Sequence, residues 1–271
     1  MATIREVFVC PPTYVELTYS INPWMDTSRP FSSEPANEQW HTLIDAYTEV
    51  LGTERVNVCP PRGGLAELCF FGDSVFLCQG KALYGEFRHP ERAPERSYVQ
   101  DYLTEHGFVG ANVPQGVYFE GAGETVMWRD KILFGFGKRS SEVVRHFLRQ
   151  TFGFDTIDLE METDDFYHLD TALLPLRSDL IAYYPGAFGP IDTATIESFD
   201  CEKIIVSEED ARTFACNAVV HDDVIFAHKG AESLWAELTR RGFHVRQFDM
   251  SEFMKLGGGI KCLTLQHYVL G

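Results

Sequence analysis

The sequence lacks any ordered arrangement of cysteines and any basic block. Its seven cysteines are irregularly spaced, without a CxxC pair or a cluster with histidine, so it predicts neither a zinc site nor a disulfide framework. The 23 Lys and Arg residues are outnumbered by 40 Asp and Glu residues, which gives a net charge of -17. Nucleic acids and anionic lipids require a positive face, so we expect neither as a partner, whereas a cationic ligand is compatible with this charge.

Long apolar runs are also missing. No apolar stretch approaches the ~18 residues of a membrane span, and no charged-then-apolar leader opens the chain. We therefore expect a cytoplasmic protein with reduced thiols, no membrane association and no metal or other cofactor. Apolar residues make up 45% of the 271 residues, which is enough to bury a sizeable core. No segment resembles a linker, so a single domain over residues 1–271 is expected.

What the sequence does contain is a repeat. Amphipathic helices are expected at intervals of roughly 50 residues, over 37–51, 95–106, 141–152, 193–198 and 232–241. Pairs of strand-like runs lie between them, at 68–71 with 74–78, 125–128 with 131–136, 172–176 with 180–184 and 215–220 with 224–227. Units of this size cannot bury their faces alone, so about five of them would pack around one axis as a closed α/β assembly. The alternative, an open doubly wound sheet, usually shows a Gly-rich first turn, which is absent here.

A run of three glycines, Gly257 to Gly259, leads into Cys262. Glycine has no Cβ, so the backbone can turn sharply or approach a ligand closely there. A thiol delivered by such a turn could act as a nucleophile. A buried structural cysteine is the alternative, and the local pattern alone favours it.

Three further polar clusters fall at the same stage of their repeats as Cys262. They are Asp73, the turn from Glu120 to Glu124, and His168 with Asp170. Singly, each could be an ordinary turn residue or a satisfied histidine. Equivalent strand ends of a closed repeat meet at one end of its axis, so these side chains are expected to converge. Cysteine, histidine and carboxylates in one pocket would supply a nucleophile, an acid/base and groups that bind a cation.

Several segments resemble one known group of enzymes. They cover 9–14, 21–26, 87–92, 184–188, 216–220 and 261–265, together with the sequence His-Leu-Asp-Thr that begins at His168. By these segments the chain resembles the amidine-modifying superfamily with the five-bladed α/β-propeller (pentein) fold. Within it, the chain is most similar to the branch of bacterial dimethylarginine dimethylaminohydrolases and arginine dihydrolases. The resemblance implies a pentein fold with pseudo-fivefold symmetry.

The resemblance also implies catalytic roles for three residues. In that superfamily a cysteine attacks the guanidinium carbon, and a histidine protonates the leaving amine and later activates water. Carried over, Cys262 is the nucleophile, His168 is the acid/base and Glu120 is the acid beside the histidine. The expected reaction passes through a covalent amidino-thioether, releases a urea product such as citrulline and requires no metal.

The remaining site residues are implied to bind the substrate. Asp73 and Asp170 would hold the guanidinium or the chain, and Arg139 would hold the α-carboxylate, with Arg92 as a second candidate. Gln79 stands where the family usually has Asp or Asn facing the guanidinium, which indicates an altered substrate.

The leading hypothesis is therefore a hydrolase of guanidinium C–N bonds in arginine or N-methylated arginine. An amidinotransferase that passes the amidino group to an amine is the alternative within the same chemistry. A pseudoenzyme that binds a cationic ligand is a third alternative, although it predicts loss of the cysteine or histidine and both are present. Assembly into a homo-oligomer stays open.

Overall fold

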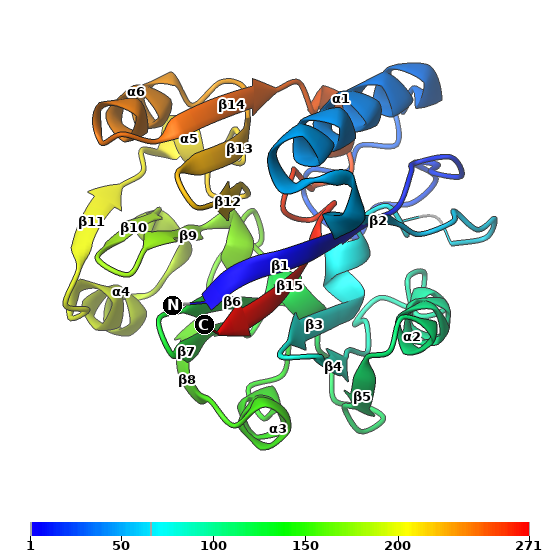
Figure 1. Cartoon of the computed structure of the whole chain (residues 1–271), viewed down its shortest axis with the longest axis horizontal. Helices are drawn as coiled ribbons and strands as arrows, with labels where there is room; N and C mark the ends of the chain where they lie inside the picture. The colour runs from blue at the N-terminus through cyan, green and yellow to red at the C-terminus, as the bar shows by residue number, and fades with distance from the viewer. Residues whose placement is uncertain (1, 66, 271) are drawn as a thin grey trace.

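The computed structural model describes residues 2–65 and 67–270 and has an α/β architecture arranged around a central axis (Figure 1). Its helices are α1 (Ser33–Leu51), α2 (Glu95–Glu105), α3 (Val144–Phe152), α4 (Pro190–Glu197), α5 (Glu208–Ala211), α6 (Glu232–Arg240) and α7 (Ser251–Met254). Its strands are β1 (Ala2–Val9), β2 (Val56–Val58), β3 (Val75–Cys78), β4 (Lys81–Tyr84), β5 (Val109–Asn112), β6 (Thr125–Trp128), β7 (Lys131–Phe136), β8 (Asp155–Glu160), β9 (Leu173–Arg177), β10 (Leu180–Tyr183), β11 (Glu202–Ile205), β12 (Val219–His221), β13 (Val224–His228), β14 (His244–Phe248) and β15 (Leu265–Leu270).

Each repeat forms a three-stranded unit with one crossover helix. In the unit of β6, β7 and β8, β6 pairs antiparallel with β7, α3 crosses over, and β8 pairs parallel with β7. The same order recurs in β3-β4-α2-β5, β9-β10-α4-β11 and β12-β13-α6-β14. The repeat of strand, strand, helix, strand that the sequence predicts is confirmed, and so is the α/β class.

The remaining unit is assembled from both ends of the sequence. β15 pairs antiparallel with β1, and β1 pairs parallel with β2 after α1 has crossed over. β15 also pairs parallel with β3, which joins two units into a sheet of order β2-β1-β15-β3-β4-β5. Figure 1 accordingly shows β1 and β15 side by side. The residues immediately before β15 are therefore held by the N-terminal strand as well as by the neighbouring unit.

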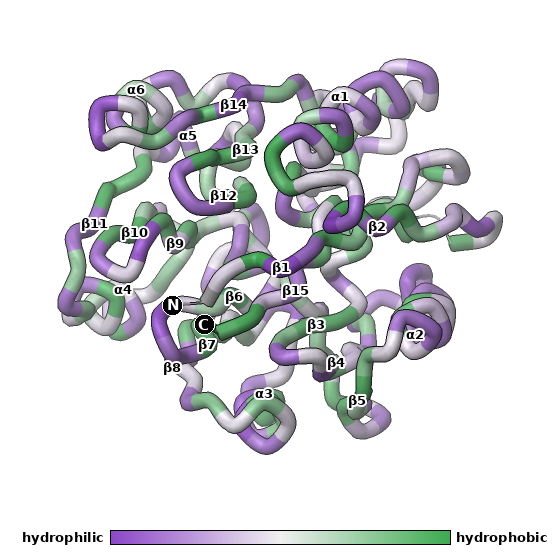
Figure 2. Tube along the Cα trace, viewed as in Figure 1, coloured by the Kyte–Doolittle hydropathy of each residue, from purple (hydrophilic) through white to green (hydrophobic). Residues whose placement is uncertain are grey.

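The core forms because the inner strands of the units are buried on both faces and the helices on one, whereas outer strands such as β5 are exposed. Every residue of β3 and β6 is buried, whereas α3 buries Val144, Leu148 and Phe152, spaced four residues apart along one side. Figure 2 shows the same division, with hydrophobic strands inside and helices that alternate between hydrophobic and hydrophilic residues.

One predicted strand pair is wrong, and one predicted site residue lies away from the site. Residues 68–71 form turns, and the partner of β3 is β4, reached through the two-residue turn Gln79-Gly80. Both turn residues have positive φ, 54° and 72°, which is the backbone that suits the twist of a tight hairpin. Gln79 is exposed and lies at the opposite end of β3 from Asp73, about 20 Å away at the rise of an extended strand. The structure thus does not place Gln79 at a guanidinium pocket.

Candidate functional site

The turns that precede the first strand of each unit meet at one end of the axis. Three of them are short 3-10 turns, before β3, β6 and β9, and consecutive ones contact each other. Unit by unit, the polar residues at these turns are Asp73, Glu120, His168, Asn217 and Cys262. All are buried. A closed repeat therefore gathers one side chain from each unit into a common place.

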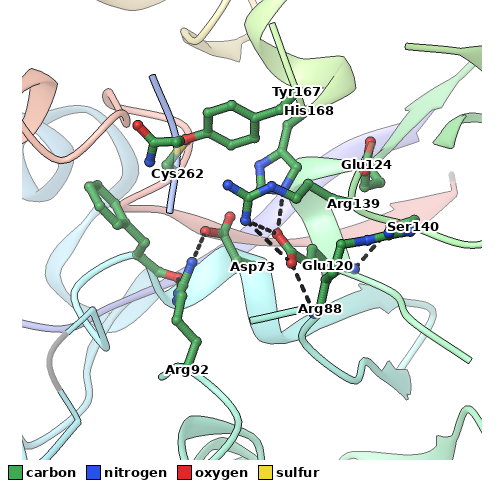
Figure 3. A network of polar contacts seen from close by, with 12 residues as sticks. Asp73, Arg88, Arg92, Glu120, Glu124, Arg139, Ser140, Tyr167, His168 and Cys262 are labelled. Carbon is green, nitrogen blue, oxygen red and sulfur yellow. Dashed lines mark hydrogen bonds and ion pairs between the residues drawn. The ribbon is translucent and has the colours of Figure 1, made fainter. Parts of the chain in front are cut away.

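These turns surround a narrow inner cavity with room for about one water molecule. Five of the predicted residues line it, namely Asp73, Arg92, Arg139, His168 and Cys262. Glu120 stands behind the wall and contacts His168, as Figure 3 shows. Of the eight predicted site residues, Asp170 is buried outside this lining and Gln79 lies far from it.

A wider basin of about 760 Å³ lies next to the inner cavity. The two spaces share four lining residues, Ile21, Asn22, Arg139 and Tyr167. Nη2 of Arg139 donates to the backbone oxygen of Ile21 (2.8 Å), and Nδ2 of Asn22 donates to that of Leu256 (3.0 Å). Arg139 thus lies where a ligand in the inner cavity would extend toward the basin.

His168 and Glu120 form a buried ion pair. Nε2 of His168 lies 2.8 Å from Oε2 of Glu120, and Nη1 of Arg139 lies 3.2 Å from the same oxygen. Burial disfavours the charged form of Glu120, but Arg139 and His168 outweigh burial and hold the pKa of Glu120 well below its usual range. Burial likewise opposes the charge on His168, yet its hydrogen bond to Glu120 and the nearby carboxylates raise its pKa to about 9. His168 is therefore an imidazolium at neutral pH.

The other ring nitrogen of His168 is left for a ligand. Its Nδ1 is buried and has no hydrogen-bond partner among the described residues. The ring lies directly on Gly123, where an added Cβ would come within 2.7 Å of Nδ1. Since Glu120 holds Nε2, Nδ1 is the position from which His168 can give up or accept a proton.

Cys262 lies in the turn that leads into β15, three residues before the strand begins. Burial, together with the charges of Asp170 and Asp73, raises the pKa of its thiol well above the usual value. Nδ2 of Asn217 lies 3.1 Å from Sγ of Cys262, and this contact acts in the opposite direction. The surroundings of Cys262 therefore favour its neutral thiol, whereas those of His168 favour its charged imidazole.

The glycine run before Cys262 is required by close packing. A Cβ on Gly257 would come within 2.5 Å of Asn22, one on Gly258 within 2.5 Å of the ring of Phe70, and one on Gly259 within 2.9 Å of Oδ1 of Asn217. Gly257 also has a φ of 85°, which L side chains rarely adopt. The sequence prediction of a close-approach turn at this run is confirmed, and what approaches is the cavity wall.

Three carboxylates surround the single guanidinium of Arg92. Its Nη1 lies 2.6 Å from Oδ2 of Asp73, its Nη2 lies 2.8 Å from Oε2 of Glu95, and its Nε lies 3.6 Å from Oε2 of Glu67. Oδ1 of Asp73 and Oε1 of Glu67 are buried without a hydrogen-bond partner among the described residues, and both residues line the inner cavity. Buried carboxylates in excess of their cation form an environment that a second cation would stabilise. Arg92 is thus committed to acidic partners rather than free for a carboxylate ligand.

Asp170 lies behind Cys262 rather than in the cavity wall. Its nearest cation is Lys261, whose Nζ lies 3.6 Å from Oδ2. Burial, opposed by Lys261, raises the pKa of Asp170 to about 6. The charge of Asp170 acts on the thiol of Cys262, so its observed influence is on the nucleophile.

Two residues at this site were not predicted from the sequence. Asn217 contacts Cys262 directly, and Glu67 places an unpartnered oxygen at the cavity. The repeat could have identified Asn217, because four units had a polar residue at the turn and the unit of β12 had been left without one. No comparable signal marks Glu67, which reaches the cavity from an irregular turn.

The described residues include neither a candidate metal site nor a helix that could span a membrane. Across 2–65 and 67–270, no group of three or more His, Cys, Asp or Glu side chains is placed to hold a metal ion. Within the same residues, no helix has the length and apolar character needed to cross a membrane.

Comparison with known proteins identifies relatives of this chain. The curated relatives include the bifunctional arginine dihydrolase/ornithine cyclodeaminase ArgZ of Synechocystis, 34% identical over 98% of this chain and 38% of ArgZ. They also include the N(G),N(G)-dimethylarginine dimethylaminohydrolase of Mycobacterium tuberculosis, 32% identical over 97% of this chain and 85% of that protein. The chain spans less than two-fifths of ArgZ and of AgrE, the similar bifunctional protein of Nostoc.

Solved structures show the same fold. The N-terminal domain of ArgZ, covalently bound to a reaction intermediate, matches with a TM-score of 0.92 at 33% identity, covering 96% of this chain and 97% of that one. The dimethylarginine dimethylaminohydrolase of Pseudomonas aeruginosa matches with a TM-score of 0.80 at 19% identity, covering 97% of this chain and 99% of that one, which supports the pentein fold alone. The family model for eukaryotic N,N-dimethylarginine dimethylhydrolase matches residues 22–269. The chain therefore belongs to the dimethylarginine dimethylaminohydrolase family.

Proposed function

We propose that this protein hydrolyses a guanidinium C–N bond of arginine or an N-methylated arginine through a covalent intermediate on Cys262. One observation carries the proposal: a buried thiol, a histidine whose Nδ1 has no described hydrogen-bond partner, and two carboxylates with an unpartnered oxygen each, Asp73 and Glu67, line one cavity. A planar cation would complement the charge of this cavity. Its carbon would then lie between a nucleophile and an acid.

The first half of the reaction forms the thioether. A guanidinium beside Cys262 favours the thiolate over the thiol, because an opposite charge stabilises the charged form. The thiolate attacks the guanidinium carbon, the C–S bond forms, and the carbon becomes tetrahedral. Nδ1 of His168 donates its proton to the departing nitrogen as the C–N bond breaks, while Glu120 keeps the ring oriented through Nε2. The amine leaves, and an amidino-thioether remains on Cys262.

The second half returns the enzyme to its starting state. The neutral His168 removes a proton from water at Nδ1, and the resulting hydroxide attacks the same carbon. The C–S bond breaks, the thiolate leaves, and a urea product is released. Asp73 and Glu67, with an unpartnered oxygen each, are proposed to hold the cationic groups of the substrate, and Arg139 is proposed to hold its carboxylate at the boundary with the basin.

The relatives support the same chemistry. Their names include arginine dihydrolase and dimethylarginine dimethylaminohydrolase. Among the similar structures, one ArgZ domain is covalently bound to a reaction intermediate, and a cysteine-to-serine variant of it is bound to substrate. We further propose that residues 1–271 act as one catalytic domain in the cytoplasm. The described cysteines are all free thiols, which is the usual state of thiols in a reducing compartment.

The test is to incubate the purified protein with arginine, monomethylarginine, asymmetric dimethylarginine and agmatine, and to identify the products by mass. Release of ammonia or a methylamine with a urea product is expected for at least one compound. His168→Ala should lower the rate by about 10²–10⁴-fold, the usual contribution of general acid/base catalysis. No turnover of any of the four compounds would overturn the proposal. Transfer of the amidino group to an added amine would show that the protein is an amidinotransferase and not a hydrolase.

A further inference from the structure

The carboxamide of Asn217 is devoted to the turn that carries Cys262. Its Oδ1 accepts hydrogen bonds from the backbone N–H groups of Lys261 (3.0 Å) and Cys262 (3.2 Å). Its Nδ2 points at Sγ of Cys262, 3.1 Å away. Asn217 is completely buried. All its recorded side-chain contacts are therefore to the nucleophile and the residue before it.

The chain maintains this arrangement at a local cost. Phe214, three residues earlier, has a φ of 57° although it is not glycine, and its backbone oxygen accepts the N–H of Asn217. A bulky residue in the left-handed region is strained, and such outliers persist where the surrounding structure imposes them. Gly259 leaves room for the carboxamide because it has no side chain: a Cβ there would come within 2.9 Å of Oδ1 of Asn217. Two independent features of the backbone thus keep the carboxamide in place.

We propose that Asn217 is a catalytic residue of the proposed reaction, whose Nδ2–H donates to Sγ of Cys262 and stabilises the thiolate as it forms and as it is expelled from the thioether. The proposal rests on the proposed role of Cys262. A sulfur in its thiolate form is a hydrogen-bond acceptor, and bonds to charged groups are stronger than bonds between neutral ones. The described neighbours of Cys262 include the carboxylates of Asp73 and Asp170, which oppose the thiolate, and the backbone of Gly259, whose hydrogen bond favours it. Asn217 adds a donor that carries no net charge, so it supports the thiolate without competing with a cationic substrate for those carboxylates.

The turn anchor and the sulfur donor are separable by substitution. Asn217→Asp is nearly isosteric and keeps an oxygen for the N–H groups of Lys261 and Cys262, but its carboxylate cannot donate to sulfur and adds a charge that itself opposes the thiolate. Asn217→Ala removes the donor without adding a charge, so a midpoint that rises in both variants reports the lost donor. Gly259→Ala leaves the amide in the sequence and displaces it, because the added Cβ meets Oδ1. Asn57→Asp is the matched control: Asn57 also uses its Nδ2, toward Glu6 and the backbone of Val7, but it lies in β2, outside the cavity.

The experiment measures alkylation of Cys262 by iodoacetamide from pH 6 to 10, with the modified residue identified by mass spectrometry, alongside kcat and KM. For Asn217→Asp we expect the pH midpoint of alkylation to rise by about one unit or more and kcat to fall about 10²-fold, as when a donor to a developing charge is removed, with KM changed less than threefold. Gly259→Ala should shift the midpoint in the same direction, and Asn57→Asp should shift neither midpoint nor kcat.

A wild-type alkylation midpoint in both Asn217→Asp and Gly259→Ala would overturn the proposal. If Asn217→Asp does not fold, Asn217→Ala decides, with its fold checked by circular dichroism, because Gly259→Ala also disturbs the hydrogen bond of the Gly259 backbone to the thiol. The alkylation measurement does not depend on turnover. If the wild-type protein hydrolyses no guanidino compound, the proposed function therefore fails, while the alkylation midpoints still decide whether Asn217 supports the thiolate.

Discussion

The first strand of each unit has two ends that follow different rules. At one end lie Asp73, Glu120 and His168, all buried, with side chains held by partners 19 to 48 residues away in sequence. At the other end lie hairpin turns such as Gln79-Gly80 and Asp222-Asp223, exposed and defined by a positive φ. The buried end depends on contacts far apart in sequence, whereas the hairpin end depends on two residues and their backbone. Substitutions should therefore affect chemistry and pH dependence at one end and only local stability at the other.

The largest effect is expected at the nucleophile. Cys262→Ser should lower kcat by at least about 10³-fold, as removal of a nucleophile does, because a hydroxyl does not form the thiolate on which the mechanism depends. The melting temperature should change by no more than a few degrees, since the two side chains are similar in shape. Steady-state kinetics and calorimetry check both expectations, and a chelator should leave the wild type fully active. Near-normal turnover by Cys262→Ser would show that Cys262 is not the nucleophile.

The next effect concerns the pH range of activity. Catalysis requires protonated His168, whose pKa is raised to about 9, so kcat should fall as the pH rises through about 9. Glu120→Gln removes the carboxylate that favours the imidazolium, so the alkaline fall in kcat should move to lower pH. At neutral pH we expect kcat to drop about 10- to 100-fold, part of the general acid/base contribution. A pH–rate profile tests this expectation. If kcat falls at the same alkaline pH in Glu120→Gln and in wild type, the proposed role of the His168–Glu120 pair is contradicted.

A smaller effect is expected on stability at Glu124, which is buried beneath the turn of His168 and accepts the N–H of Leu169 (3.3 Å). Burial raises its pKa to about 8. For a carboxyl with a raised pKa, the stabilising contribution is complete below its unfolded pKa near 4.5 and is lost as the pH rises through about 8. Wild type should therefore lose stability between about pH 5 and pH 8.5.

Glu124→Gln cannot ionise and should lack that part of the loss, on the order of 2 kcal/mol. Urea unfolding at the two pH values measures it. Glu142→Gln, at an exposed position, is the matched control and should keep the wild-type pH dependence. Identical pH dependence in Glu124→Gln and wild type would mean that Glu124 is not held neutral by burial.

The smallest effect is expected at the hairpin end. Gln79→Asn should leave every kcat/KM value unchanged and should alter the free energy of unfolding by less than about 1 kcal/mol, in the stabilising direction, because Asn tolerates positive φ better than Gln. Kinetics with arginine and methylarginine, together with urea unfolding, check this. A changed ratio of kcat/KM between the two substrates would show that Gln79 affects substrate selection.

Local patterns predicted most of the architecture. The runs 125–128 and 131–136 became β6 and β7 with the predicted bounds, because their apolar residues are bounded by clear turn residues. The error at 68–71 arose because Gln-Gly is a weaker hairpin signal than Asn-Gly or Asp-Gly. The expectation for Gln79 came from the family resemblance instead, and the structure places this residue in an exposed hairpin turn.

The site was only partly predictable for a different reason. Charged and nucleophilic side chains such as Cys262 and His168 stand out by their chemistry. Asn217 and Glu67 do not, because their importance comes from partners that lie 45 and 25 residues away in sequence. Likewise, the commitment of Arg92 to three carboxylates follows from tertiary packing that no local pattern reveals.

The pairing of β1 with β15 has a consequence for how the enzyme is made. β1 is translated before every other strand described here, and its antiparallel partner β15 is translated after all of them. Until then, β1 has only β2 beside it, and contacts of such long sequence separation form slowly. The turn of Cys262, directly before β15, therefore receives its final support only after the other units have been synthesised. The nascent chain should remain catalytically silent until this last strand is in place.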